Sequence, residues 1–300
     1  MKRKIIKQKN NAYQITLPIS WIRENGINKD SEVDLEVSGR EILVKTDDFS
    51  HEKKIKLDFR NVSWRSQYTI IASAYCAGVD QIEIHVDKDI TNDIYKFLNT
   101  IMGYALVEQT SSKLVIKYLS PGGYDDIDMI FKRVFQMIIL FFDSANKDIY
   151  GAQEASKEEV FNRDMEVNKF CLYLMRAINK MSYQCREAER AIFTFSYLIE
   201  NIGDEIRRMW QENSIKKTKK PKGMQEVSIL SKEVLQKAFF VFQNFNHKKV
   251  DEIYTLRNEV RKKAEKIKTD NSSIWGILRH IINIAEMAAD ISHLTIMKNL

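Results

Sequence analysis

The chain has 300 residues, which is enough for about two domains of roughly 150 residues each. Its 47 Lys and Arg against 41 Asp and Glu give a formal net charge of +6, and 44% of the residues are hydrophobic. This composition excludes a disordered, collagen-like or disulfide-built protein, and no apolar run is long enough to predict membrane insertion. Cys76, Cys171 and Cys185 form no close pair, so we expect a cytoplasmic protein without a Cys-built zinc site.

The positive charge is concentrated at the N-terminus. Residues 1–23 contain six basic residues and no acidic one, so this segment alone carries a charge equal to that of the whole chain. Such an asymmetry predicts a polyanion as the binding partner. The six residues are Lys2, Arg3, Lys4, Lys7, Lys9 and Arg23.

Residues 1–48 are predicted to form a small β module. Strands are expected at 4–7, 12–17, 32–37 and 41–45, with turns at Asn10-Asn11 and Ser38-Gly39. A short helix is expected at 20–25, with Ser20 as its N-cap and Gly26 at its end. Fewer than about 50 residues bury too little surface to fold alone without a metal or disulfide. A second chain is therefore expected to complete the core.

The segment from residue 4 to residue 46 resembles the swapped-hairpin domain of the AbrB/SpoVT/MazE class. The resemblance rests on the strand end ITLP, the helix WIRENGI, the strand SEVDLEV and the closing EILVK. It implies that two chains interleave their hairpins into one dimeric β-barrel and present basic loops to DNA. Members of the class often carry Gly-Arg before the ITLP-like strand, where this chain has Tyr13-Gln14.

The predicted DNA contacts follow from the basic residues and from this departure. Lysine and glutamine suit the positioning of phosphates better than the bidentate reading of guanine. The alternative is a module that only dimerises, with an incidental basic edge. The predicted DNA-binding residues are Lys2, Arg3, Lys4, Lys7, Lys9, Gln14 and Arg23.

Residues 50–119 are predicted to form a small α/β domain. The pattern indicates a strand in KKIKLD, a helix at 63–77, a strand at 81–86, a helix from 91 to 102, and strands at 105–108 and 113–118. This order suggests a ferredoxin-like or ligand-sensing domain. Nothing in it has the pattern of a catalytic site.

The remainder of the chain reads as two copies of a helical unit, at 124–213 and 224–300. The acidic pair Glu200/Asp204 recurs as Glu286/Asp290, 86 residues later in both cases. Helices are expected at 124–146, 157–181 and 185–212, and again at 226–246, 249–268 and 272–297. The linker IKKTKKPK between the copies is expected to be solvated, or alternatively to make a second contact with nucleic acid or membrane.

The acidic pairs need a compensating positive charge. Residues four apart share a helix face, and two adjacent carboxylates are unfavourable unless a cation or a basic partner compensates them. Oxygen ligands of this kind suit hard cations or iron, although solvated acids give the same pattern.

The helical copies resemble the PhoU domain, a tandem of three-helix bundles. The resemblance rests on NRDMEVNKFCLYLMR, IENIGDEIRRM and IINIAEMAADISHL. It implies iron or zinc on the bundle surface, although Asn258 replaces the acid in the second copy. The implied metal ligands are Asp164, Glu200, Asp204, Glu286 and Asp290.

The combination of these three parts resembles the archaeal-type PhoU regulators. It implies a homodimeric DNA-binding regulator of phosphate uptake or phosphate homeostasis. Its helical part would sense a metal-phosphate state or contact a phosphate transporter ATPase or sensor kinase. The alternative is an adaptor that dimerises without binding DNA. A metalloenzyme is disfavoured, because no general base, nucleophile or phosphate-binding glycine loop accompanies the acids.

Overall fold

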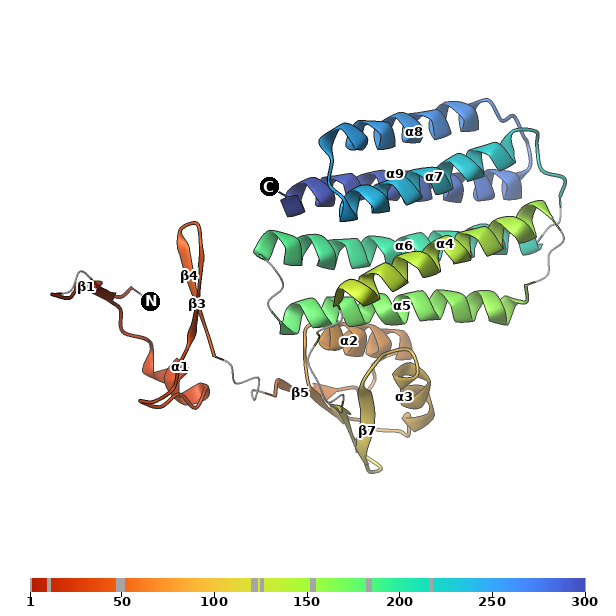
Figure 1. The fold of residues 1–300 in the computed structure, drawn as a ribbon. Helices are drawn as coiled ribbons and strands as arrows, with labels where there is room; N and C mark the ends of the chain where they lie inside the picture. Colours follow the sequence, from red (N-terminus) through yellow and green to blue (C-terminus); the bar gives the residue numbers. More distant parts are fainter. Residues whose placement is uncertain are drawn as a thin grey trace. The chain divides into compact units, whose positions relative to one another are not determined.

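The structure is a computed structural model, which describes residues 2–9, 12–46, 52–119, 124, 127–151, 155–181, 185–215 and 218–299. Its contacts divide the chain into two units, Met1–Lys53 and Lys54–Leu300 (Figure 1). The expected layout of an N-terminal β-hairpin region, an α/β sheet and a helical tandem is confirmed. The turn expected at Asn10-Asn11 lies outside the described residues.

The N-terminal unit consists of two antiparallel strand pairs and a short helix. The first pair joins β1 (Ile6–Lys7) to β2 (Tyr13–Gln14), both shorter than expected. Helix α1 (Ile19–Glu24) follows. A hairpin of β3 (Asp34–Ser38) and β4 (Glu41–Lys45) completes the unit.

The ends of α1 confirm one sequence expectation and correct another. The N-cap is Pro18 and not Ser20, which lies inside the helix. The proline ring restricts φ near −65°, and Pro18 has φ −64° and ψ 132°, so the N-cap lies two residues earlier than expected. Gly26, with φ +62°, ends the helix as predicted, and the N–H of Ile27 donates to the Ile22 carbonyl at 3.0 Å.

The second unit begins with a four-stranded sheet in the order β5-β6-β8-β7. β5 and β6 are parallel, and the other neighbours are antiparallel. The chain order β-α-β-α-β-β is the expected one, but it differs from the β-α-β-β-α-β order of ferredoxin-like domains. Helix α3 ends at Leu98, earlier than the expected Met102. The elements are β5 (Lys54–Asp58), α2 (Trp64–Cys76), β6 (Gln81–His85), α3 (Thr91–Leu98), β7 (Tyr104–Gln109) and β8 (Lys113–Tyr118).

Six long helices follow the sheet within the described part of the chain, and their ends lie within a few residues of the predicted ones. None of the described helices combines the length and apolarity needed to cross a bilayer. At the start of α5, Ser156 and Glu159 form the reciprocal hydrogen bonds of a capping box. The helices are α4 (Ile127–Tyr150), α5 (Lys157–Lys180), α6 (Arg186–Ile215), α7 (Met224–Gln243), α8 (His247–Glu265) and α9 (Ser272–Asn299).

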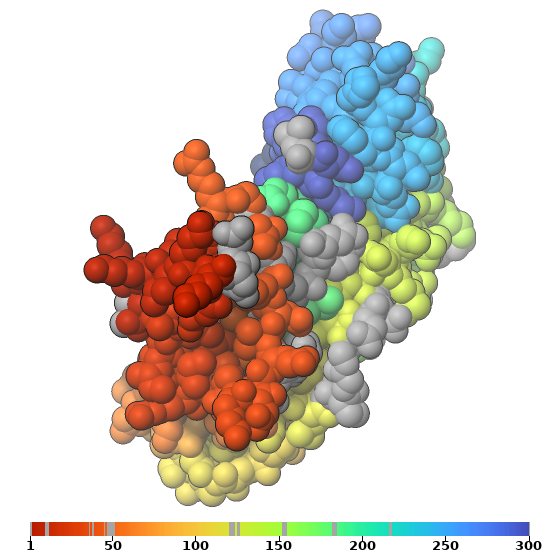
Figure 2. All heavy atoms as spheres, turned by 60° about the vertical axis from the view of Figure 1, so that its left-hand side comes forward, coloured from red at the N-terminus to blue at the C-terminus, as the bar shows by residue number. Residues whose placement is uncertain are grey.

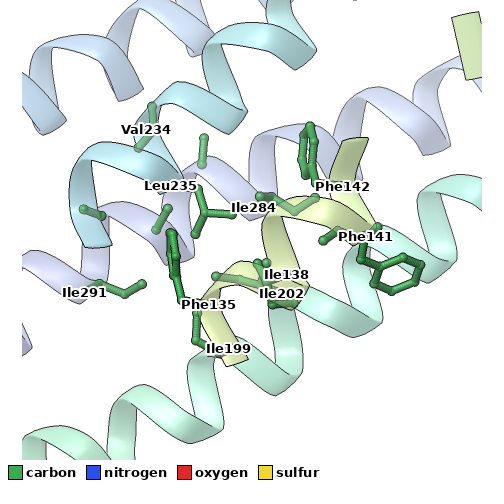
Figure 3. Close-up of a cluster of buried hydrophobic side chains, with 14 of the residues drawn as sticks. Phe135, Ile138, Phe141, Phe142, Ile199, Ile202, Val234, Leu235, Ile284 and Ile291 are labelled. Atoms are coloured by element: carbon green, nitrogen blue, oxygen red, sulfur yellow. The ribbon is translucent and has the colours of Figure 1, made fainter. Parts of the chain in front are cut away.

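The two helical copies share one hydrophobic core. The predicted apolar stripes of α6 and α9 are buried, including Ile199 and Ile202 in the first copy and Leu278 and Ile281 in the second. Figure 3 shows Phe135 and Ile138 of α4 among side chains from α6, α7 and α9. Each copy therefore buries its apolar face partly against the other, as expected for stacked repeats.

A polar cluster crosses this core between α6 and α9. The Glu205 carboxylate accepts a hydrogen bond from Asn283 at 2.9 Å and from Arg208 at 2.8 Å. Its other partner is the buried His280, whose Nδ1 lies 2.8 Å from Glu205 Oε2. Burial raises the pKa of Glu205, but these partners outweigh it and hold the pKa at about 2. His280, which lies six residues before Glu286 of the second acidic pair, thus joins the two repeats.

Arg176 of α5 attaches the sheet domain to the helices. Its side chain is fully buried, and its guanidinium donates to Asp80 Oδ1 at 2.7 Å and to the Val79 carbonyl at 2.6 Å. It also donates to the Tyr75 carbonyl and to the Tyr124 hydroxyl, each at 3.1 Å. A buried cation is tolerated only when it is paired and hydrogen-bonded. Three aromatic rings complete its surroundings: Tyr75, Tyr104 and Tyr118.

Arg176→Met is expected to lower the free energy of unfolding by about 3–5 kcal/mol, because it leaves buried carbonyls and part of the Asp80 charge unpaired. Urea denaturation of the full chain measures this loss. The matched control is Lys169→Met on the same helix, whose contact with Glu166 is long, at 3.9 Å, and partly exposed, so its cost should stay below about 1 kcal/mol. Equal losses in the two variants would contradict the anchoring role.

Candidate nucleic-acid interface

All seven predicted DNA-contact residues are exposed on the N-terminal unit. None of the six basic residues forms an ion pair with any residue that the structure describes. Gln14 is partly engaged, because its Oε1 accepts a hydrogen bond from Gln8 Nε2 at 2.9 Å. Figure 2 shows the first residues of the chain, in the deepest red, on the outer surface of their own unit. The basic edge is therefore uncompensated by the residues of this unit that the structure describes.

The β1–β2 ribbon decides which of these side chains share a face. Lys7 pairs with Tyr13, and Ile6 pairs with Gln14. Because successive residues of a strand point to opposite faces, Lys7 and Gln14 lie on opposite sides of the ribbon. Arg23 belongs to the last turn of α1. Lys7 therefore shares a face of the ribbon with Tyr13 and not with Gln14.

The β3–β4 hairpin has an apolar face without a cover. Leu35 pairs with Val44 and Val37 pairs with Ile42, so these four side chains lie on one face. Leu35, Val37 and Ile42 are 64–72% exposed. No hydrophobic side chain that the structure describes up to residue 46 is buried. A hairpin of this size needs another surface to pack against.

In the first helical copy, the predicted acidic site is neutralised by arginine. Asp164 of α5 accepts a hydrogen bond from Arg207 Nε at 2.9 Å, and Asp204 of α6 accepts one from Arg207 Nη2 at 2.7 Å. Arg208 also pairs with Asp204. Arg207 therefore bridges two of the three carboxylates that were predicted to form the metal site of this copy. The third, Glu200, lies one turn before Asp204 on the same helix.

The second copy shows the same compensation with different residues. Glu286 accepts hydrogen bonds from Arg257 at 3.0 Å and from Arg261 Nη2 at 2.6 Å. Asp290 is exposed and forms no ion pair with a described residue. Each acidic pair was predicted to need a cation or a basic partner, and arginines pair with one acid of each pair, Asp204 and Glu286. The pairing of Arg207 and Arg208 with Asp204 could be predicted from their closeness in the sequence. The pairing of Arg257 and Arg261 with Glu286 could not, because it depends on the packing of α8 on α9.

The donor atoms of the first copy do not make a metal site as they are arranged. In the described ranges, no three His, Cys, Asp or Glu side chains are grouped so that they could hold a metal ion. Asp164 Oδ1 and Asn168 Oδ1 are buried without a hydrogen-bond partner, but they supply only two oxygens. Iron or zinc prefers four or more ligands. The iron or zinc implied by the PhoU resemblance stays a prediction.

Burial changes the titration of the same acids. Burial, with the neighbouring Asp204 and Asp164 charges, raises the pKa of Glu200 from 4.5 to about 7. Burial also raises the pKa of Asp164 to about 6, although Arg207 opposes this shift. The acidic cluster between α5 and α6 therefore changes its charge near neutral pH.

Glu200→Gln is expected to remove a pH dependence of stability. The Glu200 carboxyl has a pKa of about 4.5 when unfolded and about 7 when folded, so unfolding releases a proton between these values and stability falls as pH rises through this window. The variant should match the wild type near pH 4.5 and be more stable at about pH 8. Thermal denaturation at both pH values measures this, with the exposed Glu166→Gln as control. A difference that is the same at both pH values would disprove the assignment.

Comparison with known proteins gives a match for the N-terminal unit. Residues 6–49 match the family described as antidote-toxin recognition MazE, bacterial antitoxin. Neither the comparison with curated proteins nor that with solved structures gave a match. The family match spans β1 to β4, and it confirms the expected similarity of this module to the AbrB/SpoVT/MazE class of swapped-hairpin DNA-binding domains. The PhoU resemblance of the helical repeats stays a prediction.

Proposed function

We propose that the protein is a homodimeric DNA-binding regulator of transcription that controls phosphate uptake or phosphate homeostasis. One observation carries the proposal: the module that is similar to a DNA-binding domain has both an unpaired basic edge and an uncovered apolar hairpin face. The basic edge suits a polyanion, and the apolar face suits a second copy of the same module.

The dimer would form through the β3–β4 hairpin. The exposed Leu35, Val37 and Ile42 would each contribute on the order of 1 kcal/mol when covered, because burial of apolar surface is favourable. An isologous contact repeats the same patch on both chains, so one apolar face is sufficient. The interleaved barrel of the AbrB/SpoVT/MazE class is the form that we expect for this dimer.

The dimer would bind DNA through its phosphates. Lysine and arginine side chains release counterions from the duplex, and this release dominates affinity and makes it depend on salt. A dimer carries the basic edge twice. The predicted contacts, including Gln14, favour positioning on the backbone over base reading.

The helical tandem would receive the signal. The recurrence of the acidic pairs, with Asp204 in one and Glu286 in the other paired with arginine, supports the resemblance of the tandem to PhoU. Contact with a phosphate transporter ATPase or a sensor kinase, or binding of iron or zinc with phosphate, would be that signal.

The alternative is an adaptor that dimerises without binding DNA. It is favoured by Gln14, which replaces the arginine of many family members and is occupied by its hydrogen bond with Gln8. The two functions differ in DNA affinity.

Val37→Asp combined with Ile42→Asp is expected to abolish the dimer, because it places charges on the apolar hairpin face. Sedimentation analysis should give twice the chain mass of 35.2 kDa for the wild type and the single mass for the variant. Val107→Asp, at an exposed strand position in the second unit, is the matched control and should remain dimeric. A wild type that sediments as a monomer would contradict the proposal.

Changing Lys2, Arg3, Lys4 and Lys7 to Gln is expected to weaken binding to duplex DNA. Each lost phosphate contact makes the slope of log affinity against log salt less negative by about 0.9, so a dimer should lose up to about 7. Fluorescence anisotropy across a salt series measures the slope. A variant with Lys88, Lys132, Lys157 and Lys248 changed to Gln matches its charge and should bind almost normally. A wild type that binds no DNA at low salt would favour the adaptor.

A further inference from the structure

The linker between the helical repeats and the C-terminal part of α8 are both rich in lysine. The described linker residues include Lys219 and Lys222, and residues 257–268 contain six basic residues against Glu259 and Glu265. In the sequence these segments are separated by the whole of α7. The N-terminal module accounts for neither of them.

The fold brings the two segments to one end of the helical tandem. The linker enters α7 through Gly223, and α8 ends beside the start of α7 (Figure 1). An ion pair between Lys263 of α8 and Glu226 in the first turn of α7 fixes this arrangement, with 2.5 Å between Nζ and Oε1. Met224 and Ile267 are buried in the same core.

Some cations at this end are already neutralised. Lys263 is paired with Glu226 and Glu259, and Arg261 with Glu286. Lys220 is partly buried and donates to Asn213 and to the Thr218 carbonyl.

Five other lysines at this end are exposed and form no ion pair with a described residue. Two nearby acids, Glu265 and Asp270, are likewise without an ion pair to the described residues, and the five lysines outnumber these two acids by three. Lys262 and Lys266 are four residues apart on one helix face, a spacing at which like charges repel. We call these five residues the lysine cluster: Lys219, Lys222, Lys262, Lys266 and Lys268.

We propose that the lysine cluster is a second contact for the phosphate backbone of duplex DNA. The proposal rests on the proposed DNA binding and extends it to a surface of the helical tandem. Exposed lysines on two separate segments present point charges over an extended area, which suits a row of phosphates rather than one small anion. The uncompensated repulsion within the cluster is relieved when a polyanion approaches.

An anionic membrane surface is the other polyanion to consider. Ile215 and Trp275, at the same end of the tandem, are 71% and 48% exposed. However, the Trp275 indole donates a hydrogen bond to the Thr269 carbonyl at 2.8 Å, which holds the ring against its own loop. The similarity of the N-terminal unit to DNA-binding domains favours DNA.

The test compares the salt dependence of DNA binding in the full chain. In one variant, Lys219, Lys222, Lys262 and Lys266 are changed to Gln, and binding to a duplex of random sequence is measured by fluorescence anisotropy. The log–log slope should become less negative by up to about 3.6 for each chain in contact, since each phosphate contact adds about 0.9. The variant with Lys88, Lys132, Lys157 and Lys248 changed to Gln has the same net charge and should change the slope by less than about 1.

The outcomes separate this inference from the proposed function. If the N-terminal variant flattens the slope and the lysine-cluster variant does not, the inference is overturned while the DNA-binding function stands. If the wild type itself binds no DNA, both are overturned. Co-sedimentation with phosphatidylglycerol vesicles tests the alternative, an anionic membrane surface. Loss of vesicle binding with an unchanged DNA slope would make the cluster a membrane contact. Thermal denaturation of the variant confirms that it remains folded.

Discussion

The arrangement of the second unit depends on one buried cation. Arg176 belongs to a helix of the tandem, yet its partners Asp80, Val79 and Tyr75 belong to the sheet domain. Neither part alone can satisfy this charge, and a buried charge without partners costs several kcal/mol. The sheet domain and the helical repeats are therefore held as one body. A movement of α5 would be transmitted to the sheet, because the guanidinium cannot keep its partners if only one side moves.

The N-terminal unit presents the opposite physical situation. Its described residues include no buried hydrophobic side chain, and the hairpin side chains Leu35, Val37 and Ile42 face outward. The second unit has its own buried cores, whereas this module needs apolar surface from outside the module. If a second copy supplies that surface, folding of the module and doubling of its basic edge are the same event. DNA binding would then increase more steeply with the concentration of the protein than it would for a monomer.

The elements that the sequence predicted well are those whose signal is local. The helices of the tandem were recognisable from the 3–4 spacing of residues such as Ile192, Phe195 and Ile199, which are buried. The prediction of Ser20 as the N-cap is wrong, because Pro18 already fixes the entry to α1. The partners of the acidic pairs were only partly predictable. Arg207 lies three residues after Asp204, but Arg257 reaches Glu286 only because α8 packs on α9. Nothing local distinguishes Arg176 from an exposed arginine.

Arginine and lysine side chains differ in their surroundings in this structure, which the net charge alone does not show. Three arginines form internal pairs: Arg176, Arg207 and Arg257 each bind a partly or fully buried carboxylate. Its planar fork makes several hydrogen bonds at fixed angles, and it is hydrated more weakly than an ammonium. The exposed basic residues at the N-terminus are mostly lysine, and those of the cluster at one end of the tandem are all lysine. Salt screens exposed charges and affects buried pairs little. If the proposed contacts with a polyanion form, rising ionic strength should therefore weaken them before it weakens the fold.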